Sequence, residues 1–281
     1  MKKLPIGIQS IKKILDEGEY IYVDKTGFIK RLIDEGAPYF FMSRPRRFGK
    51  SLFVNTLEEI FKGNKELFKG LKIYDSEYDW QEYPVLHFDF SLIASTEKGE
   101  FKISLQEAIF KIAKFHGLSI EGSSIQILLE SLIEKLSKIN RVVVLVDEYD
   151  SAIINNLKNP EIAEKNRDIL KDFFGALKGL DKHLKFTFVT GVSKFSQVSL
   201  FSGPNNLKDI TMDPRYAAMM GYTEEEIKEI FSEHIQSIVE NRDKQQGSLF
   251  TKDSILEEIR IWYNGYRFSR AKTCVYNPFS T

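Results

Sequence analysis

The stretch from Tyr39 to Leu52, YFFMSRPRRFGKSL, decides the fold that we expect for this 281-residue chain. Its first four residues are aromatic or apolar, which is typical of a strand buried on both faces. A loop with three arginines follows, and Gly49, Lys50 and Ser51 then begin an amphipathic helix. The order of strand, loop and helix N-terminus predicts a phosphate-binding loop, in which backbone N–H groups face an anion.

In a loop of this kind, Lys50 reaches the β- and γ-phosphates of a nucleoside triphosphate, and the Ser51 hydroxyl is a ligand of Mg²⁺. The usual pattern has a glycine where this chain has Arg44, and a Gly-Lys-Ser tripeptide also occurs by chance. Taken alone, the stretch is equally compatible with an ordinary helix start that carries a surface lysine. The residues expected around the phosphates are Arg44, Pro45, Arg46, Arg47, Phe48, Gly49, Lys50, Ser51 and Leu52.

The second motif lies about a hundred residues downstream, from Arg141 to Asp150, RVVVLVDEYD. Its run of β-branched and other apolar residues predicts a central parallel strand, which ends at Asp147 and Glu148. Ligands bind at the carboxyl edge of such sheets, so both carboxylates are expected beside the phosphate loop. We expect Asp147 to hold the Mg²⁺ shell and Glu148 to orient or deprotonate an attacking water. A solvated acidic loop is the alternative, which the Gly-Lys-Ser helix start disfavours.

These motifs together resemble the AAA-ATPase-like domain family of prokaryotes. The resemblance also rests on YVDKT (Tyr22–Thr26), TGVSKFS, LKDIT, DPRYA, WYNGYRF and YNPFS, and it runs from near residue 8 to the last residue. The family's own loop carries arginine at its first position, so Arg44 is no departure from it. Full-length members usually continue into a domain that resembles a PD-(D/E)XK nuclease. That domain is absent here, so we expect a shortened chain or a short member.

The resemblance implies binding of ATP and Mg²⁺, with the base held near Tyr22, Val23 and Asp24 by backbone groups and apolar contacts. The alternative for this segment is a turn before an ordinary helix. A turn-rich loop further on holds Asn205 and Asn206, which are candidates to contact the nucleotide or a partner.

A polar side chain is also expected beside the attacking water. In this class of NTPase, it lies on the strand between the strands that carry the two phosphate motifs. Thr190 is the first choice for this role and Ser193 the second; the alternative is that Thr190 only caps the turn at Gly191.

Arginines aimed at the γ-phosphate can accelerate phosphoryl transfer ~10³-fold or more. Arg46 and Arg47 in the loop, and Arg215 in DPRY, are the candidates. Alternatively, Arg46 and Arg47 form ion pairs with Glu148 or Asp150 and only brace the loop, which would leave the enzyme slow. The expected catalytic set is Lys50, Asp147, Glu148, Thr190 and Arg47.

The rest of the chain predicts an α/β fold in which a mostly parallel central sheet is flanked by helices. Strands that alternate with helices pair in parallel. We expect a P-loop ATPase core over residues 1–220 and a C-terminal helical lid over residues 221–281. Further strands are expected at 84–90, 185–192 and 207–211, and helices at 25–35, 97–115, 125–139 and 159–180.

In the lid, Thr223 and Glu226 predict a capping box. Asn264 and Gly265 predict a turn among aromatic residues. A cluster of this sort more often packs a subdomain than stacks nucleic-acid bases. Its aromatic members are Trp262, Tyr263, Tyr266 and Phe268, and the isoleucines at 139 and 238 are expected to face inward in their helices.

Composition excludes several classes of protein. Forty basic residues balance forty acidic ones, which removes the strongest argument for nonspecific nucleic-acid binding. No apolar stretch approaches ~18 residues, and Cys274 is the only cysteine, so neither a membrane span nor a disulfide framework is predicted. We expect a cytoplasmic protein.

The sequence therefore predicts a Mg²⁺-dependent ATPase domain that acts as a nucleotide-driven switch for a C-terminal effector. The alternative is a nucleotide-binding interaction module with little or no hydrolysis. Oligomerisation is left open.

Overall fold

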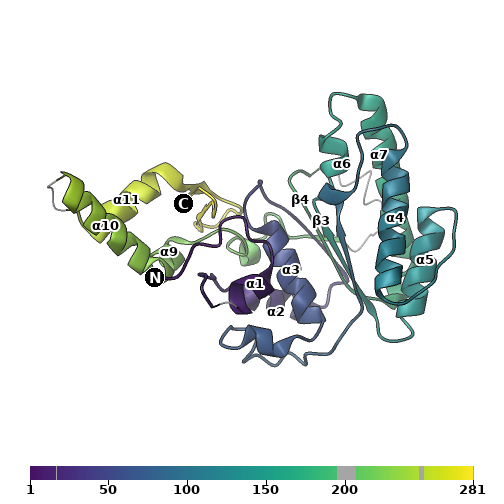
Figure 1. Cartoon of the computed structure of the whole chain (residues 1–281), viewed down its shortest axis with the longest axis horizontal. Coiled ribbons are helices and arrows are strands. Elements are labelled where there is room, and N and C mark those ends of the chain that lie inside the picture. The colour runs from purple at the N-terminus through teal and green to yellow at the C-terminus, as the bar shows by residue number, and fades with distance from the viewer. Residues whose placement is uncertain (17, 195–206, 247–249, 281) are drawn as a thin grey trace.

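A parallel β-sheet lies between two layers of helices, and a smaller helical subdomain stands to one side of it (Figure 1). The computed structural model describes residues 1–16, 18–194, 207–246 and 250–280. Within that part of the chain the sheet has five strands in the order β2-β3-β4-β1-β5, and each pairing is parallel. The predicted α/β fold is therefore confirmed. The strands are β1 (Tyr39–Ser43), β2 (Val85–Asp89), β3 (Val142–Asp147), β4 (Leu184–Gly191) and β5 (Leu207–Asp209).

β1 is buried along its whole length, as its apolar sequence predicts. Side chains of a strand alternate between the two faces of a sheet. Phe41 accordingly packs in one hydrophobic core, while Phe40 and Met42 pack in the other. Both cores are covered by helices, so the strand carries no polar face and can stand inside the sheet.

The helices divide between the two faces of the sheet. Figure 1 shows the N-terminal helices and α3 on one side and the long helices α4, α5 and α7 on the other. Helices α1 (Ile11–Asp16), α2 (Thr26–Glu35) and α3 (Lys50–Phe61) form the first layer. The second layer comprises α4 (Glu100–Phe115), α5 (Ile125–Leu136), α6 (Ser151–Ile154) and α7 (Pro160–Gly179).

The C-terminal subdomain consists of α9 (Glu224–Ile230), α10 (Ser232–Gln246), α11 (Lys252–Tyr263) and an antiparallel pair of strands, β6 (Asn264–Tyr266) and β7 (Val275–Tyr276). It has a small hydrophobic core of its own. The predicted capping box begins α9: the Thr223 hydroxyl accepts from the Glu226 amide, and the Glu226 carboxylate accepts from the Thr223 amide. The division at residue 220 stays a prediction.

An ion pair joins this subdomain to the start of α2. The Lys25 ammonium donates to the Glu226 carboxylate at 2.6 and 2.7 Å and to the Ala218 carbonyl at 2.9 Å. Lys25 is 8% exposed. Because an unpaired buried charge is costly, the carboxylate that caps α9 also fixes that helix against the start of α2.

Several local predictions were wrong. Asn264 and Gly265 lie in β6 rather than in a turn. Ile139 is 77% exposed because α5 ends three residues earlier, and Ile238 is 39% exposed on α10. Asn205 and Asn206 lie outside the described residues.

The α3 helix is tied to β2 by a polar cluster. The Glu58 carboxylate lies 2.9 Å from Nδ1 of His87 on β2 and accepts from the Lys62 ammonium at 2.7 Å. Burial opposes the charged form of Glu58, but the hydrogen bonds from His87 and Lys62 outweigh it and lower its pKa to about 2.

This cluster predicts a stability change in acid. A carboxyl whose pKa falls on folding stabilises the fold fully above its unfolded pKa near 4.5, and that stability is lost as pH falls toward 2. Over this window Glu58 should account for up to about 3 kcal/mol of the free energy of unfolding. In Glu58→Gln, urea unfolding should show a correspondingly smaller loss between pH 4.5 and 2. Glu77→Gln, at an exposed position, is the control; equal acid losses in all three proteins would contradict the prediction.

Candidate functional site

The carboxyl ends of three neighbouring strands bring the predicted motifs to one edge of the sheet. In register, Met42 of β1 pairs with Thr190 of β4, and Asp89 of β2 pairs with Asp147 of β3. The β4 strand lies between β1 and β3, where the expected polar residue had been placed. Thr190 and Asp147 therefore end adjacent strands, beside the strand that leads into the loop at 44–49.

The loop is shaped by two residues with left-handed backbone. Gly49 has φ of 84° and caps the N-terminus of α3, and Arg47 has φ of 68°. A Cβ at Gly49 would meet no atom within 4 Å, so this position needs glycine for its conformation and not for space. The first hydrogen bond of α3 runs from the Phe53 amide to the Gly49 carbonyl at 3.0 Å. The amides before it have no partner within the helix, which makes this end of α3 an anion-binding surface.

Lys50 points into this loop. Its ammonium donates to the carbonyls of Arg44 and Pro45 at 3.2 and 3.1 Å, and the residue is 4% exposed. Burial lowers the pKa of Lys50, an effect that the carboxylates of Asp147 and Glu148 oppose. Stronger acceptors, such as phosphate oxygens, would satisfy the same ammonium better than two neutral carbonyls.

Ser51 lies close to Asp147, which is 2% exposed. Burial raises the pKa of Asp147, and the nearby Ser51 side chain lowers it. The two predicted metal ligands are thus brought together at the start of α3 and the end of β3.

The oxygens of Ser51 and Asp147 suit a Mg²⁺ ion that is also bound by phosphates, rather than a metal ion held by protein side chains alone. The described residues contain no group of three or more histidine, cysteine or acidic side chains that could hold an ion. Mg²⁺ is usually bound through one or two protein oxygens together with phosphates and waters. A hydroxyl and one carboxylate beside a phosphate loop match that donor set, in which the ion arrives with the nucleotide.

Glu148 is placed by a strained backbone. Its φ is 49°, in the left-handed region that residues other than glycine seldom adopt. Burial raises the pKa of Glu148, the charge of Asp147 raises it further, and Lys50 opposes both. A carboxylate with a raised pKa is a better proton acceptor, which suits a general base.

Thr190 has a buried hydroxyl that is available for a ligand. The residue is fully buried, and its Oγ1 has no hydrogen-bond partner among the residues that the structure describes. Its carbonyl accepts from the Tyr149 amide at 3.0 Å, so only the backbone of Thr190 is engaged. The predicted second choice, Ser193, donates its amide to Asp150 at 2.7 Å.

The arginines differ in what their side chains contact. Arg44 is buried, and its guanidinium donates to the carbonyls of Ser43 at 3.0 Å and Thr211 at 2.8 Å, so its side chain braces the loop from beneath. Arg47 stacks on the ring of Phe279, with its guanidinium carbon 3.8 Å from the ring centre. In the described part of the chain neither Arg46 nor Arg47 forms the ion pair with Glu148 or Asp150 that the bracing alternative requires.

Arg215 is occupied by carboxylates. It forms ion pairs with Asp213, at 2.5 Å, and with Glu35 at the end of α2. Both partners hold the guanidinium beside β5 and α2, so reaching a phosphate bound at the loop would require breaking two ion pairs.

The segment from Tyr22 to Asp24 is engaged in local structure. The Tyr22 side chain lies near Thr56, in the middle of α3, and Val23 is 6% exposed. The Asp24 carboxylate accepts from the Thr26 amide and the Lys72 amide, both at 2.8 Å. None of these hydrogen bonds reaches the loop at 44–49, and the role of this segment in holding a base stays a prediction.

Sequence reasoning missed a clamp formed by the DEYD motif. The Asp150 carboxylate accepts from the amides of Val192 and Ser193 at 3.0 and 2.7 Å, and the Tyr149 hydroxyl donates to the Ser193 carbonyl at 2.9 Å. A Cβ at Gly191 would lie 2.6 Å from the Tyr149 ring, so only glycine allows this approach. The signal available in the sequence was the occurrence of Tyr149 and Asp150 after one strand together with Gly191 at the end of the next strand.

A second missed feature is the packing of the C-terminal segment on the loop. Phe48 is 1% exposed, and its ring makes edge contacts with Tyr266 and Phe268, with ring centres 4.8 and 5.3 Å apart. Tyr266 and Phe268, two of the four clustered aromatic residues, therefore have a packing role, but they pack against the loop at 44–49. Trp262 of the same cluster is 77% exposed.

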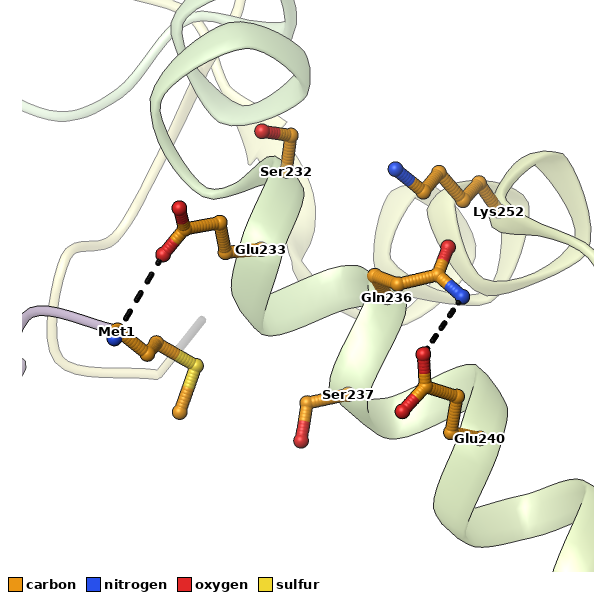
Figure 2. Close-up of a pocket in the computed structure, with 7 residues that line it drawn as sticks. All are labelled: Met1, Ser232, Glu233, Gln236, Ser237, Glu240 and Lys252. Carbon is orange, nitrogen blue, oxygen red and sulfur yellow. Dashed lines mark hydrogen bonds and ion pairs between the residues drawn. The ribbon is translucent and has the colours of Figure 1, made fainter.

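One hollow of the described surface is remote from these motifs. Its volume is about 430 Å³, and Figure 2 shows it along α10, where the Met1 amino group lies 3.9 Å from Glu233 and the Gln236 amide donates to Glu240. None of its lining residues belongs to the loop or to the acidic motif. We therefore place the candidate site by chemistry, at the sheet edge. The described residues also contain no helix long and apolar enough to cross a membrane.

Comparison with known proteins assigns a family. The model of a family described as Predicted AAA-ATPase matches residues 5–201, which include the GKS and VDEYD stretches. The chain belongs to this family. A protein of Azotobacter chroococcum mcd 1, described as an uncharacterized protein in the vnfD 5' region, is 43% identical over 281 residues. The match covers 99% of this chain and 51% of that relative, so the chain spans about half the length of the curated relative it matches.

The clamp at Asp150 gives a prediction. Asp150→Asn keeps one carbonyl oxygen but loses the charge-assisted hydrogen bonds to two partly buried amides, and should lower the free energy of unfolding by about 2 kcal/mol. Hydrogen exchange at Val192 and Ser193 should accelerate more than exchange in α3. Asp172→Asn, at an exposed position on α7, should change neither. Unaltered exchange at the two amides in Asp150→Asn would show that the clamp does not hold this strand end.

Proposed function

We propose that this chain is a Mg²⁺-dependent domain that binds and hydrolyses ATP. The observation that supports the proposal most directly is that Ser51 and Lys50, at the N-terminus of α3, both lie near Asp147. The lysine and the carboxylate come from two motifs about a hundred residues apart. Membership of the Predicted AAA-ATPase family supports nucleotide binding in general.

The loop would bind the phosphates with charge and backbone. The Lys50 ammonium would exchange the carbonyls of Arg44 and Pro45 for β- and γ-phosphate oxygens, and amides at the start of α3 would donate to the same group. Ser51 and Asp147 would hold Mg²⁺, which neutralises charge on the phosphates during transfer.

Hydrolysis would need a positioned water. Glu148, with its pKa raised by burial and by Asp147, would accept a proton from that water, and the unpaired Thr190 hydroxyl would hold the water or a γ-phosphate oxygen. We also propose that the nucleotide state is transmitted to a C-terminal effector, since the Azotobacter relative is about twice as long as the part that this chain matches.

A second candidate function is a nucleotide-binding module with little or no turnover. The placement of the arginines favours it: Arg44 is buried beneath the loop, Arg47 stacks on Phe279 and Arg215 is held by two carboxylates. Arg46 is the candidate that this placement leaves, because it is exposed and its charge acts on Lys50 and Glu148. If Arg46 does not reach the γ-phosphate, an ATPase of this kind loses ~10³-fold or more in rate.

The two functions differ in the effect of Glu148→Gln. If the chain hydrolyses ATP, phosphate release should fall by at least ~10²-fold in this variant while the affinity for Mg²⁺-ATP stays within about twofold. In wild type the rate should rise with pH through a pKa above the ordinary value of 4.5, because Glu148 must be deprotonated to act. The measurements are phosphate release against pH and calorimetric ATP binding. Tight binding with no phosphate release from either protein would establish the binding module instead.

Nucleotide binding itself is tested at Lys50. In Lys50→Ala the charge-assisted hydrogen bonds to the phosphates are lost, so the affinity for Mg²⁺-ATP should fall by at least ~10-fold. Lys62→Ala removes an ammonium at the far end of α3 and is the control; it should bind ATP like wild type. Equal affinities in wild type and Lys50→Ala would contradict the proposed site.

A further inference from the structure

Three residues of the C-terminal strap, which we define as residues 264–279, contact the loop at 44–49. Phe48 makes edge contacts with Tyr266 and Phe268, at interplanar angles of 75° and 84°. The third contact is the stack of Arg47 on Phe279. These contacts join residues more than two hundred positions apart. The strap lies outside the region that the family model matches.

Phe268 contacts both ends of the loop. Its ring lies 4.0 Å from the guanidinium carbon of Arg44, where β1 ends, and packs on Phe48, next to the Gly49 that caps α3. Edge-to-face aromatic pairs and cation–π contacts each stabilise one relative orientation. A single ring therefore fixes the two anchors between which the loop is suspended.

The loop between these anchors is strained. Arg47 has φ of 68°, a conformation that costs a residue other than glycine free energy and persists only where its surroundings enforce it. The Lys50 ammonium depends on the same loop, because it donates to the carbonyls of Arg44 and Pro45. Movement of Arg44 or Phe48 would displace both the loop amides and this lysine.

We propose that Phe268, supported by Tyr266, is a positioning residue of the phosphate loop. Its ring holds Arg44 and Phe48 so that the loop amides and Lys50 are preorganised for a triphosphate. The part of this inference that concerns affinity rests on the proposed function. Because coupling between two sites is reciprocal, the nucleotide must in turn stabilise the strap.

The test uses variants that separate the ring from its bulk. Phe268→Leu keeps apolar volume but removes the π face, and Phe268→Tyr keeps the face. Trp262→Leu removes an exposed aromatic side chain six residues earlier and is the control. Three quantities are measured for each: the dissociation constant for Mg²⁺-ATP, the free energy of unfolding, and hydrogen exchange of residues 44–49 without nucleotide.

Phe268→Leu should bind Mg²⁺-ATP about tenfold more weakly, equivalent to ~1.4 kcal/mol, and its loop amides should exchange faster. Phe268→Tyr and Trp262→Leu should both keep the wild-type affinity for Mg²⁺-ATP and the wild-type exchange of the loop amides. In wild type, Mg²⁺-ATP should slow exchange of residues 264–268. If Phe268→Leu does not fold, Tyr266→Leu, at a ring that is 39% exposed, is measured in its place with the same expectations.

Two outcomes would overturn the inference. One is a less stable Phe268→Leu with unchanged affinity and loop exchange, which would make the strap a structural contact only. The other is a Phe268→Leu variant whose affinity for Mg²⁺-ATP and loop exchange equal those of Phe268→Tyr, since apolar bulk alone would then suffice. If wild type does not bind Mg²⁺-ATP, the proposed function fails; faster loop exchange in Phe268→Leu would still support the positioning role, and unchanged exchange would overturn it.

Discussion

The closeness of the Ser51 side chain to the buried Asp147 carboxylate is the constraint on which the candidate site depends. The first turn of α3 lies beside the end of β3, although β4 separates β3 from the strand that feeds the loop. Only the parallel register of β1, β4 and β3 brings these ends to one edge, so the sheet order and the candidate site have the same cause.

The charges at this edge explain why a divalent ion belongs in the proposed mechanism. Asp147, Glu148 and Asp150 all act on the buried Lys50 ammonium, and burial raises the pKa of each of these carboxyls. A triphosphate would add further negative charge beside them. One buried lysine cannot compensate both the acids and the phosphates in a medium of low dielectric constant. In the proposed mechanism, Ser51 and Asp147 would hold a divalent cation, whose charge would offset this repulsion.

Local sequence patterns predicted the strands and the helix cap, which depend on neighbouring residues. They failed for features that depend on contacts between distant segments. The apolar runs at β1 and β3 and the capping box at Thr223 follow from short-range rules, and the structure confirms them. The Asn-Gly dipeptide after Tyr263 behaves differently: it has turn chemistry, yet pairing with β7 draws it into a strand. The clamp of Asp150 on the β4 end and the packing of Phe268 on the loop needed knowledge of which segments meet in space. No pattern within a short window of sequence carries that information.

The arginine at the first loop position shows why these distant contacts matter. A glycine there would need no partners, whereas the buried guanidinium of Arg44 must be satisfied, and it takes the carbonyls of Ser43 and Thr211 and the face of Phe268. Burial lowers its pKa to about 10, so the group stays charged at neutral pH and cannot leave this environment without cost. The hydrogen bonds of the charged Arg44 guanidinium therefore hold the start of the loop in place, whereas a glycine at this position would make no such bonds. The shape of the loop therefore depends on Thr211 and Phe268 as well as on its own residues, and this dependence is the reason to count the C-terminal segment with the candidate site.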